Sequence, residues 1–264
     1  MAATVMGPSV NRIDGRKKVT GTAQYAVEMV LGEMAFAVLV GSAKPGGRIL
    51  SIDTEAAEQA PGVLLVMTHK NAPRLGDMPT DMQSGGLVAE ERPPLADDRI
   101  FHTGQYIAMV VAERIEQATY AASLLKIEYK PGPFAVALTQ AQNTKYAPKE
   151  FMHEPLNFER GNVDKALKAA EVRLDQTYVT PNEHPCALEP HAVIASWSNG
   201  ALTIYNATQW VGGDRTVIAA AFKLPVEKVR VLCPFTGGMF GSKAATGGHV
   251  LLAAVAAKQL NRPV

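Results

Sequence analysis

Cysteine is almost missing from this chain of 264 residues, which contains only Cys186 and Cys233. Two thiols form at most one disulfide, and they are too few for a four-cysteine zinc or iron–sulfur site. We therefore expect two ordinary buried thiols in a reducing compartment. A redox metal, if the protein uses one, is not held by its own cysteines.

An excess of charge of either sign is also missing. The 26 Lys and Arg residues against 25 Asp and Glu residues give a formal net charge of +1, so we expect neither nucleic acid nor an anionic membrane as a partner. No apolar run approaches the roughly 18 residues of a membrane span. Residues 1–8 lack the basic start and the apolar run of a secretory signal. We expect a cytoplasmic protein, with the periplasm as the alternative.

Apolar runs and helical stripes alternate along the chain and predict a mixed α/β (α+β) fold. With 47% apolar and 19% charged residues the composition is that of a globular protein, and the length allows one large domain or two small ones. Expected strands cover residues 34–40, 48–52, 63–68, 106–112, 124–129, 172–180, 192–197, 202–206 and 228–232. Expected helices cover residues 54–59, 115–125, 163–170, 214–223 and 247–260.

Several connections between these elements have sequence signals. The strand, helix and strand between residues 106 and 129 look like a βαβ unit. Asn199-Gly200 predicts a tight hairpin, and Asn162 is a suitable N-cap for the helix that follows it. The segment 71–94 is rich in Gly, Pro and Met, which predicts a long loop.

A domain boundary is expected in the middle of the chain. Residues 136–160 are polar and poor in apolar anchors, so we interpret them as a linker between domains at about 10–135 and 161–264. The last expected helix, 247–260, is apolar nearly all round, which predicts burial on most sides. Few residues remain to cover it, so we expect the chain to be a fragment or one piece of a split subunit.

The densest local motif is a glycine-rich loop between a strand and a helix, Pro234-Phe235-Thr236-Gly237-Gly238-Met239-Phe240-Gly241-Ser242-Lys243. Free N–H groups at such a helix start can bind an anion, so phosphate or pterin binding is one interpretation. A phosphate-binding P-loop of the Walker type is excluded, because Ser242 separates Gly241 from Lys243. A plain tight turn without function is the equally weighted alternative.

Three other sets of polar residues stand out. His184, Glu189 and His191 are common metal ligands, but two prolines break any helix that would present them together, so structural hydrogen bonding is favoured. Gln209 follows a strand, and its uncharged amide could donate to an oxo or sulfido ligand. A surface glutamine is the alternative. The basic residues Lys223, Lys228 and Arg230 are interpreted as a solvated face.

Taken together, spaced motifs resemble one family, the molybdenum-binding large subunits of the xanthine dehydrogenase and aldehyde oxidase enzymes. They are Arg12-Ile-Asp-Gly, Val19-Thr-Gly-Thr-Ala-Gln-Tyr-Ala26, Ala60-Pro-Gly-Val63, Gly104-Gln105, Glu189-Pro-His191, Ala207-Thr-Gln209, Arg215, Leu224-Pro225, Lys228-Val-Arg230 and the loop 237–243. The resemblance implies an N-terminal hammerhead domain, here about residues 10–135, followed at 161–264 by the beginning of the first molybdopterin-binding domain.

The resemblance also implies an activity, a cofactor and partners. The family oxidises aldehydes to carboxylic acids with water as the oxygen source, through attack by Mo–OH and hydride transfer to Mo=S. The implied cofactor is molybdenum-molybdopterin in its cytosine dinucleotide form, with 2Fe-2S and FAD on an iron–sulfur subunit and an FAD subunit. The general-base glutamate lies near the end of the much longer family subunit, and no position here matches it. The isolated chain is therefore expected to be inactive without the C-terminal remainder of the molybdenum subunit.

By match to the family motifs, Gln209 would hydrogen-bond a molybdenum ligand, and the loop of Gly237, Gly238, Met239, Phe240 and Gly241 would bind the cofactor. Phe240 would line the substrate funnel.

Two departures from the family pattern bear on the substrate. Met239 stands where a glycine is usual, and Ala244 stands where purine-hydroxylating members have a glutamate. A small aldehyde is therefore the expected substrate, and bacterial aldehyde oxidoreductases are the most similar branch. The alternatives are an N-heterocycle-hydroxylating member, a non-catalytic scaffold or assembly fragment, and an independent phosphate-binding protein.

Overall fold

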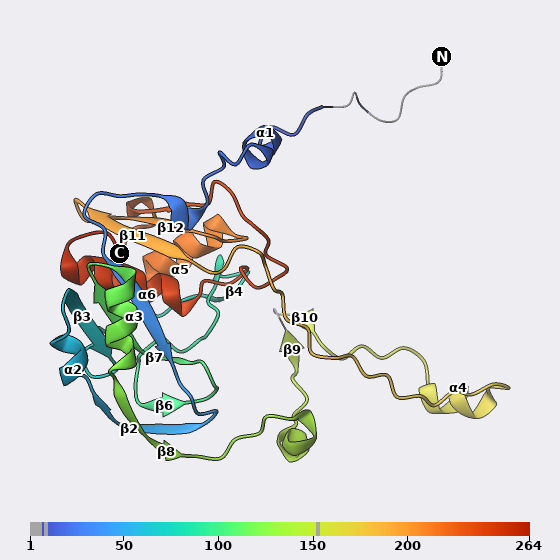
Figure 1. Cartoon of the computed structure of the whole chain (residues 1–264). Helices are drawn as coiled ribbons and strands as arrows, with labels where there is room; N and C mark the ends of the chain where they lie inside the picture. The colour runs from blue at the N-terminus through green and yellow to red at the C-terminus, as the bar shows by residue number, and fades with distance from the viewer. Residues whose placement is uncertain (1–6, 8–9, 152–153) are drawn as a thin grey trace.

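The computed structural model describes residue 7 and residues 10–151 and 154–264. Residues 1–8, which lack a secretory signal in the sequence, lie outside the described residues except for residue 7. Two short helices, α1 (Gly15–Val19) and η1 (Ala26–Glu28), precede the first strand. The body of the molecule and a long extension are shown in Figure 1. No helix among the described residues has the length and apolar character that a membrane crossing requires.

The first half of the chain builds two small antiparallel sheets. One has the order β1–β7–β3 and consists of Phe36–Gly41, Tyr106–Ala112 and Val63–Thr68. The other has the order β6–β2–β8 and consists of Arg99–Ile100, Gly47–Asp53 and Lys126–Pro131. The helix α2 (Glu55–Glu58) packs on β3, and α3 (Ile115–Ser123) packs on β1 and β7. The expected strands and helices of this half are confirmed.

The expected βαβ unit at 106–129 is wrong. The strand β7 lies in the middle of its sheet and pairs with β1 on one side and β3 on the other. Because both of its edges are occupied, β8 cannot join it after α3 and pairs with β2 instead. The expected loop at 71–94 is confirmed apart from one small ladder, in which β4 (Thr80–Asp81) pairs with β5 (Gly86–Leu87).

The second half contains a three-stranded sheet with the order β11–β12–β13. The strands β11 (Val193–Ser198) and β12 (Ala201–Asn206) form the expected hairpin, in which Asn199 and Gly200 have φ of 49° and 72° as a type I′ turn requires. The helix α5 (Val211–Phe222) and the short η3 (Val226–Lys228) then lead to β13 (Val229–Leu232), which runs parallel to β12.

The helix α6 (Gly248–Leu260) lies between the sheets of the two halves (Figure 1). It packs against β11 and β12 on one side and against β3 and β7 on the other. Every residue from Val250 to Ala257 is buried, as expected from the sequence. The expectation that the helix lacks cover is wrong, because strands from both halves supply it. One hydrophobic core therefore includes residues of both predicted domains.

A long extension, residues 132–190, leaves the body and returns to it (Figure 1). It contains η2 (Leu138–Thr144), the paired strands β9 (Glu150–Phe151) and β10 (Glu154–Pro155), and α4 (Val163–Ala169). The predicted N-cap is confirmed, since the Asn162 side chain accepts a hydrogen bond from the Lys165 N–H at 2.8 Å. The expected strand at 172–180 is wrong: these residues are exposed and have no neighbouring described strand with which to pair.

Candidate functional site

Gln209 and the glycine-rich loop meet at the carboxyl ends of the strands β12 and β13. Gln209 follows β12 and the loop follows β13, and the carboxyl ends of these parallel strands lie side by side. The Gln209 N–H donates to the Lys243 carbonyl oxygen at 2.9 Å, and the Lys243 N–H donates to Gln209 Oε1 at 3.2 Å. The structure thus brings together the two parts of the site predicted from sequence. Ligands of open α/β sheets commonly bind at such an edge.

The loop has a backbone that depends on glycine at several positions. Gly238 and Gly241 have φ of 105° and 89°, and Phe240 between them has φ of 50°, which is costly for a residue with a side chain. A Cβ added to Gly237 would lie 2.5 Å from Glu189 Cβ. This conformation leaves the Phe240 side chain exposed. Met239 accepts hydrogen bonds at its carbonyl oxygen from the Ser242 N–H and hydroxyl.

A buried ion pair lies beneath the loop. Lys243 Nζ is 3.1 Å from Glu189 Oε2 and also donates to the Glu189 carbonyl oxygen at 2.8 Å. The same carboxylate oxygen accepts the Gly237 N–H at 2.8 Å. Only 1% of the Lys243 side chain and 9% of the Glu189 side chain are exposed. The two charges of this pair compensate each other.

A second buried polar cluster connects the strand β12, the helix α5 and the segment before α6. Asp214, in the first turn of α5, accepts hydrogen bonds from the Thr246 hydroxyl at 2.6 Å and from the Asn206 amide at 2.8 Å. Burial raises the pKa of Asp214, and the hydrogen bonds from Thr246 and Asn206 oppose that rise. All three side chains are buried within the body. The cluster fixes the chain on both sides of the site.

The two histidines near the loop pack against each other. The rings of His191 and His249 have centroids 5.4 Å apart and planes at 77°. Burial lowers the pKa of His191, as does the Lys243 charge, which Glu189 partly offsets. Burial also lowers the pKa of His249 to about 4, with a smaller effect from His191. Both rings are therefore neutral at pH 7.

The stability of the protein should depend on pH through His249. The folded pKa of about 4 lies below the ordinary 6.5, so below pH 6.5 the unfolded chain binds a proton that the folded chain does not. The free energy of unfolding should fall as pH is lowered from 6.5 toward 4, by up to about 1.4 kcal/mol per pH unit from this group. In His249→Phe that part of the slope should vanish in urea titrations at pH 7, 6 and 5, whereas the exposed-site control His102→Asn should keep it. An unchanged slope in His249→Phe would contradict the assignment.

The metal interpretation of His184, Glu189 and His191 finds no support. The Glu189 carboxylate is hydrogen-bonded to Gly237 and Lys243, His191 packs on His249, and His184 is exposed. The hydrogen-bonding interpretation is confirmed for Glu189. Within the described part of the chain, no three His, Cys, Asp or Glu side chains are grouped as metal ligands would be.

The expectation of two buried thiols is wrong. Cys186 is exposed in the extension, where the body does not cover it, and Cys233 is half-buried with its sulfur 3.1 Å from the Thr236 hydroxyl. Both thiols are free.

The basic residues behave as predicted. Lys223 at the end of α5, Lys228 in η3 and Arg230 in β13 are all exposed, as a solvated face requires.

Sequence reasoning missed the buried polar contacts that hold the loop and the neighbouring segments in place. Asp214 and Thr246 are ordinary polar residues in the sequence, and Lys243 was considered only as a member of a motif. Two features of the sequence could have indicated them. Lys243 is a charged residue at the end of a glycine-rich turn, and Asp214 is a charged residue in the first turn of a mostly apolar helix.

The fold and this loop define a class of protein. Residues 20–133 match the a/b hammerhead domain of aldehyde oxidase and xanthine dehydrogenase, and residues 144–264 match a molybdopterin cofactor-binding domain. The chain belongs to the aldehyde oxidase and xanthine dehydrogenase family, as its motifs predicted. The expected order of a hammerhead domain followed by a cofactor-binding domain is also confirmed.

Particular relatives refine this class. The chain is 40% identical to the aldehyde oxidoreductase molybdenum-binding subunit PaoC of Escherichia coli, over 98% of the chain and 34% of that subunit. It is 31% identical to a probable xanthine dehydrogenase subunit of Bacillus subtilis, over 97% of the chain and 34% of the relative. Quinoline 2-oxidoreductase from Pseudomonas putida has the same fold, with a TM-score of 0.83 at 24% identity over 98% of this chain and 34% of that one. The chain spans about a third of the length of these relatives.

Proposed function

We propose that this chain is part of a molybdenum hydroxylase that oxidises small aldehydes to carboxylic acids. The observation that carries the proposal is the junction of Gln209 with the loop 237–243, which is made through Lys243. It brings a neutral amide and an exposed aromatic ring to the carboxyl ends of β12 and β13. The similarity to an aldehyde oxidoreductase subunit supports an aldehyde as the substrate. Ala244, with no hydrogen-bonding group in its side chain, favours an aldehyde over a purine.

The residues present fit a molybdenum cofactor. Among the described residues, Nε2 of the exposed Gln209 side chain has no hydrogen-bond partner, so it is free to donate to an oxo or sulfido ligand. The exposed turn at Gly241 has no atom within 4 Å of an added Cβ, so its backbone is open to a bound group. The Lys243 charge is neutralised by Glu189 and adds no net charge to the site.

Each of these groups has a task in the proposed reaction. When bound, a molybdenum-molybdopterin group supplies the two-electron oxidation with water as the oxygen source. The Gln209 amide and the backbone of Gly238, Met239 and Gly241 hold and orient that group as preorganised dipoles. Phe240 forms one apolar wall of the substrate funnel and restricts water. We place the general base outside this chain, on the remainder of the molybdenum subunit.

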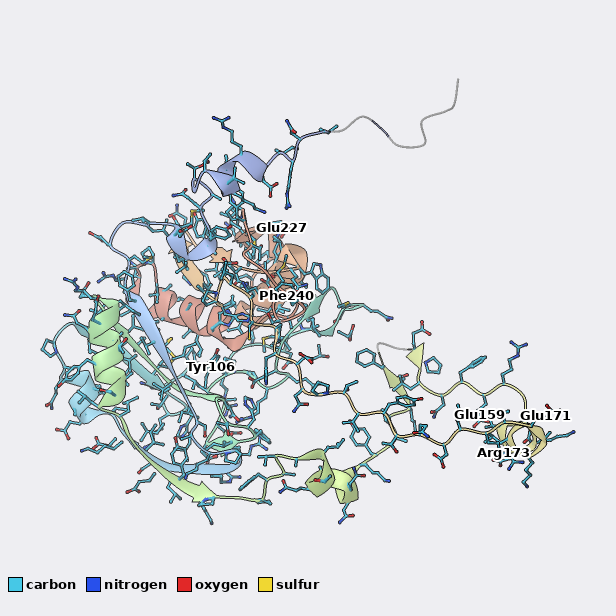
Figure 2. The ribbon with its side chains drawn as sticks, turned by 45° about the vertical axis from the view of Figure 1, so that its right-hand side comes forward. Tyr106, Glu159, Glu171, Arg173, Glu227 and Phe240 are labelled. Atoms are coloured by element: carbon cyan, nitrogen blue, oxygen red, sulfur yellow. The ribbon has the colours of Figure 1, made fainter. Side chains whose placement is uncertain are left out.

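The extension supports the proposal of partner polypeptides. Figure 2 shows Glu159, Glu171 and Arg173 at its outer end, away from Phe240 and the body. Apolar side chains along the extension are exposed far beyond the scatter usual on a monomer surface. They include Phe134, Leu138, Tyr146, Phe151, Leu156, Phe158, Leu174, Tyr178 and Val179. We assign this surface to contact with the remainder of the molybdenum subunit. The iron–sulfur and FAD subunits, carrying 2Fe-2S and FAD, complete the proposed assembly, and the cofactor is proposed in its cytosine dinucleotide form.

Two substitutions at Gln209 test the site in the assembled enzyme. Gln209→Ala removes both the donor and the acceptor for Lys243, whereas Gln209→Glu keeps an acceptor oxygen and removes the donor. Both should lower kcat with benzaldehyde, on the order of 100-fold for loss of one preorganised donor. The exposed glutamine control Gln259→Ala should leave kcat unchanged.

Two results would contradict this assignment. Turnover that falls in Gln209→Ala but not in Gln209→Glu would remove the donor role. Elemental analysis that finds no molybdenum in the purified assembly, with no partner polypeptide by mass spectrometry, would support a scaffold in place of an enzyme component.

A further inference from the structure

One residue contacts both ends of the glycine-rich loop. At the start of the loop, Glu189 Oε2 accepts the Gly237 N–H at 2.8 Å, and the Glu189 N–H donates to the Gly237 carbonyl oxygen at 3.1 Å. At the end of the loop, Lys243 Nζ donates to the carbonyl oxygen of Glu189 at 2.8 Å and to its Oε2 at 3.1 Å. The two ends of the loop are thereby tied to a single residue that is 48 positions from Gly237 and 54 from Lys243.

Lys243 extends this tie to Gln209. Its backbone exchanges two hydrogen bonds with Gln209, one through the Gln209 N–H and one through Oε1. The side chain and the backbone of Lys243 therefore connect the Glu189 segment, the Gln209 segment and the loop. By contrast, Phe240 at the middle of the loop is exposed and has φ of 50°. A conformation that is costly at its middle must be held from its ends.

The burial of the Glu189–Lys243 ion pair indicates that the pair specifies the conformation of the loop. A buried ion pair adds little net stability compared with apolar residues of the same volume, because both charges lose their hydration. Here the two side chains are 1% and 9% exposed, and each also binds a backbone group of the other segment. Those directional backbone contacts fix where the ends of the loop lie, which apolar replacements could not do.

We propose that Glu189 is a positioning residue that, with Lys243, sets the conformation of the 237–243 loop and the placement of Gln209. The part of this inference that concerns a cofactor rests on the proposed function. Glu189 itself lies beneath the loop, and it acts through Gly237 and Lys243. Loss of the tie should loosen the loop while the rest of the fold remains intact.

Three variants of the full chain, prepared without cofactor, separate positioning from simple charge compensation. Glu189→Gln and Lys243→Met each leave one buried group without its partner, and both should lower the thermal midpoint. The double variant Glu189→Gln/Lys243→Met has no unpaired charge and should recover most of that midpoint. The methionine that replaces Lys243 cannot donate to residue 189, so the loop stays untied at one end. The control Asp98→Asn breaks the Arg48–Asp98 ion pair at the surface. It should change neither the thermal midpoint nor the conformation of the loop.

Hydrogen exchange of a peptide covering residues 235–246 is the deciding measurement. In the double variant this peptide should exchange about tenfold faster than in the wild type, while peptides from β7 and α6 exchange at the wild-type rate. Wild-type exchange in the loop of the double variant would overturn the proposal, as would equal acceleration of all three peptides. The outcome does not depend on molybdenum.

Molybdenum content of the assembled protein then tests the link to the cofactor. A wild-type assembly that contains molybdenum and a double variant that has lost at least half of it would support the link, and equal content would overturn it. If the wild-type assembly contains none, the proposed function fails while the exchange result still decides the role of Glu189.

Discussion

Replacing Leu251 with alanine should lower the free energy of unfolding by about 2–5 kcal/mol, the range for a fully buried leucine whose cavity cannot collapse. The side chain is 0% exposed and belongs to the core that joins the β1–β7–β3 sheet, the β11–β12–β13 sheet and α6. Because both halves of the chain pack on this helix, both should lose stability together. Urea unfolding followed by tryptophan fluorescence and by far-UV circular dichroism should give one shared, lowered midpoint.

A control on the same helix separates this effect from a change in helix propensity. Gln259 is exposed near the end of α6, so Gln259→Ala should shift the midpoint little. Two separate transitions in Leu251→Ala, with only one of them lowered, would contradict a shared core.

Replacing Asp214 with alanine should cost roughly 2–4 kcal/mol, because the Asn206 amide and the Thr246 hydroxyl would both remain buried without an acceptor. Asp214→Asn should cost less, since it keeps one acceptor oxygen and removes the carboxylate whose pKa burial has raised. Urea unfolding of both variants at pH 7 checks the order. Equal stability of Asp214→Ala and the wild type would mean that the cluster does not connect β12, α5 and the segment before α6.

Local features of the fold could be predicted from the sequence. The strands at 63–68 and 106–112 were located to the residue, because each is a continuous apolar run bounded by turn residues. The hairpin at Asn199-Gly200 followed from backbone angles that few residue types adopt. In both cases the cause of the structure lies within a few residues of the element.

Pairings over long sequence distances could not be predicted. The propensity of residues 172–180 for strand was real, but a strand needs a neighbour, and none of the described strands lies next to it. Likewise, nothing near α6 in the sequence indicates that β3 and β7 cover it. The error at β8 has the same origin, because the edges of β7 were already occupied by β1 and β3.

The residues of the candidate site could be predicted from the sequence, but the contacts that hold them could not. Gln209 and the loop 237–241 were identified by motif, and the parallel pairing of β12 and β13 explains why they meet. The tie through Glu189 was not identified, because its contacts with Gly237 and Lys243 join segments about fifty positions apart. The roles of Gln209 and the loop toward a cofactor remain predictions to be tested by the substitutions above.

The position of α6 in the sequence determines when the β1–β7–β3 sheet can be covered during translation. The strands β1, β3 and β7 are complete at residue 112, but the helix that covers one face of their sheet begins at Gly248. At about 5–20 residues per second, a ribosome needs roughly seven to thirty seconds to supply that helix. During this interval the apolar face of the nascent sheet lacks the helix that covers it in the folded protein. The hammerhead half is therefore made first but is among the last parts of the chain to reach its native packing.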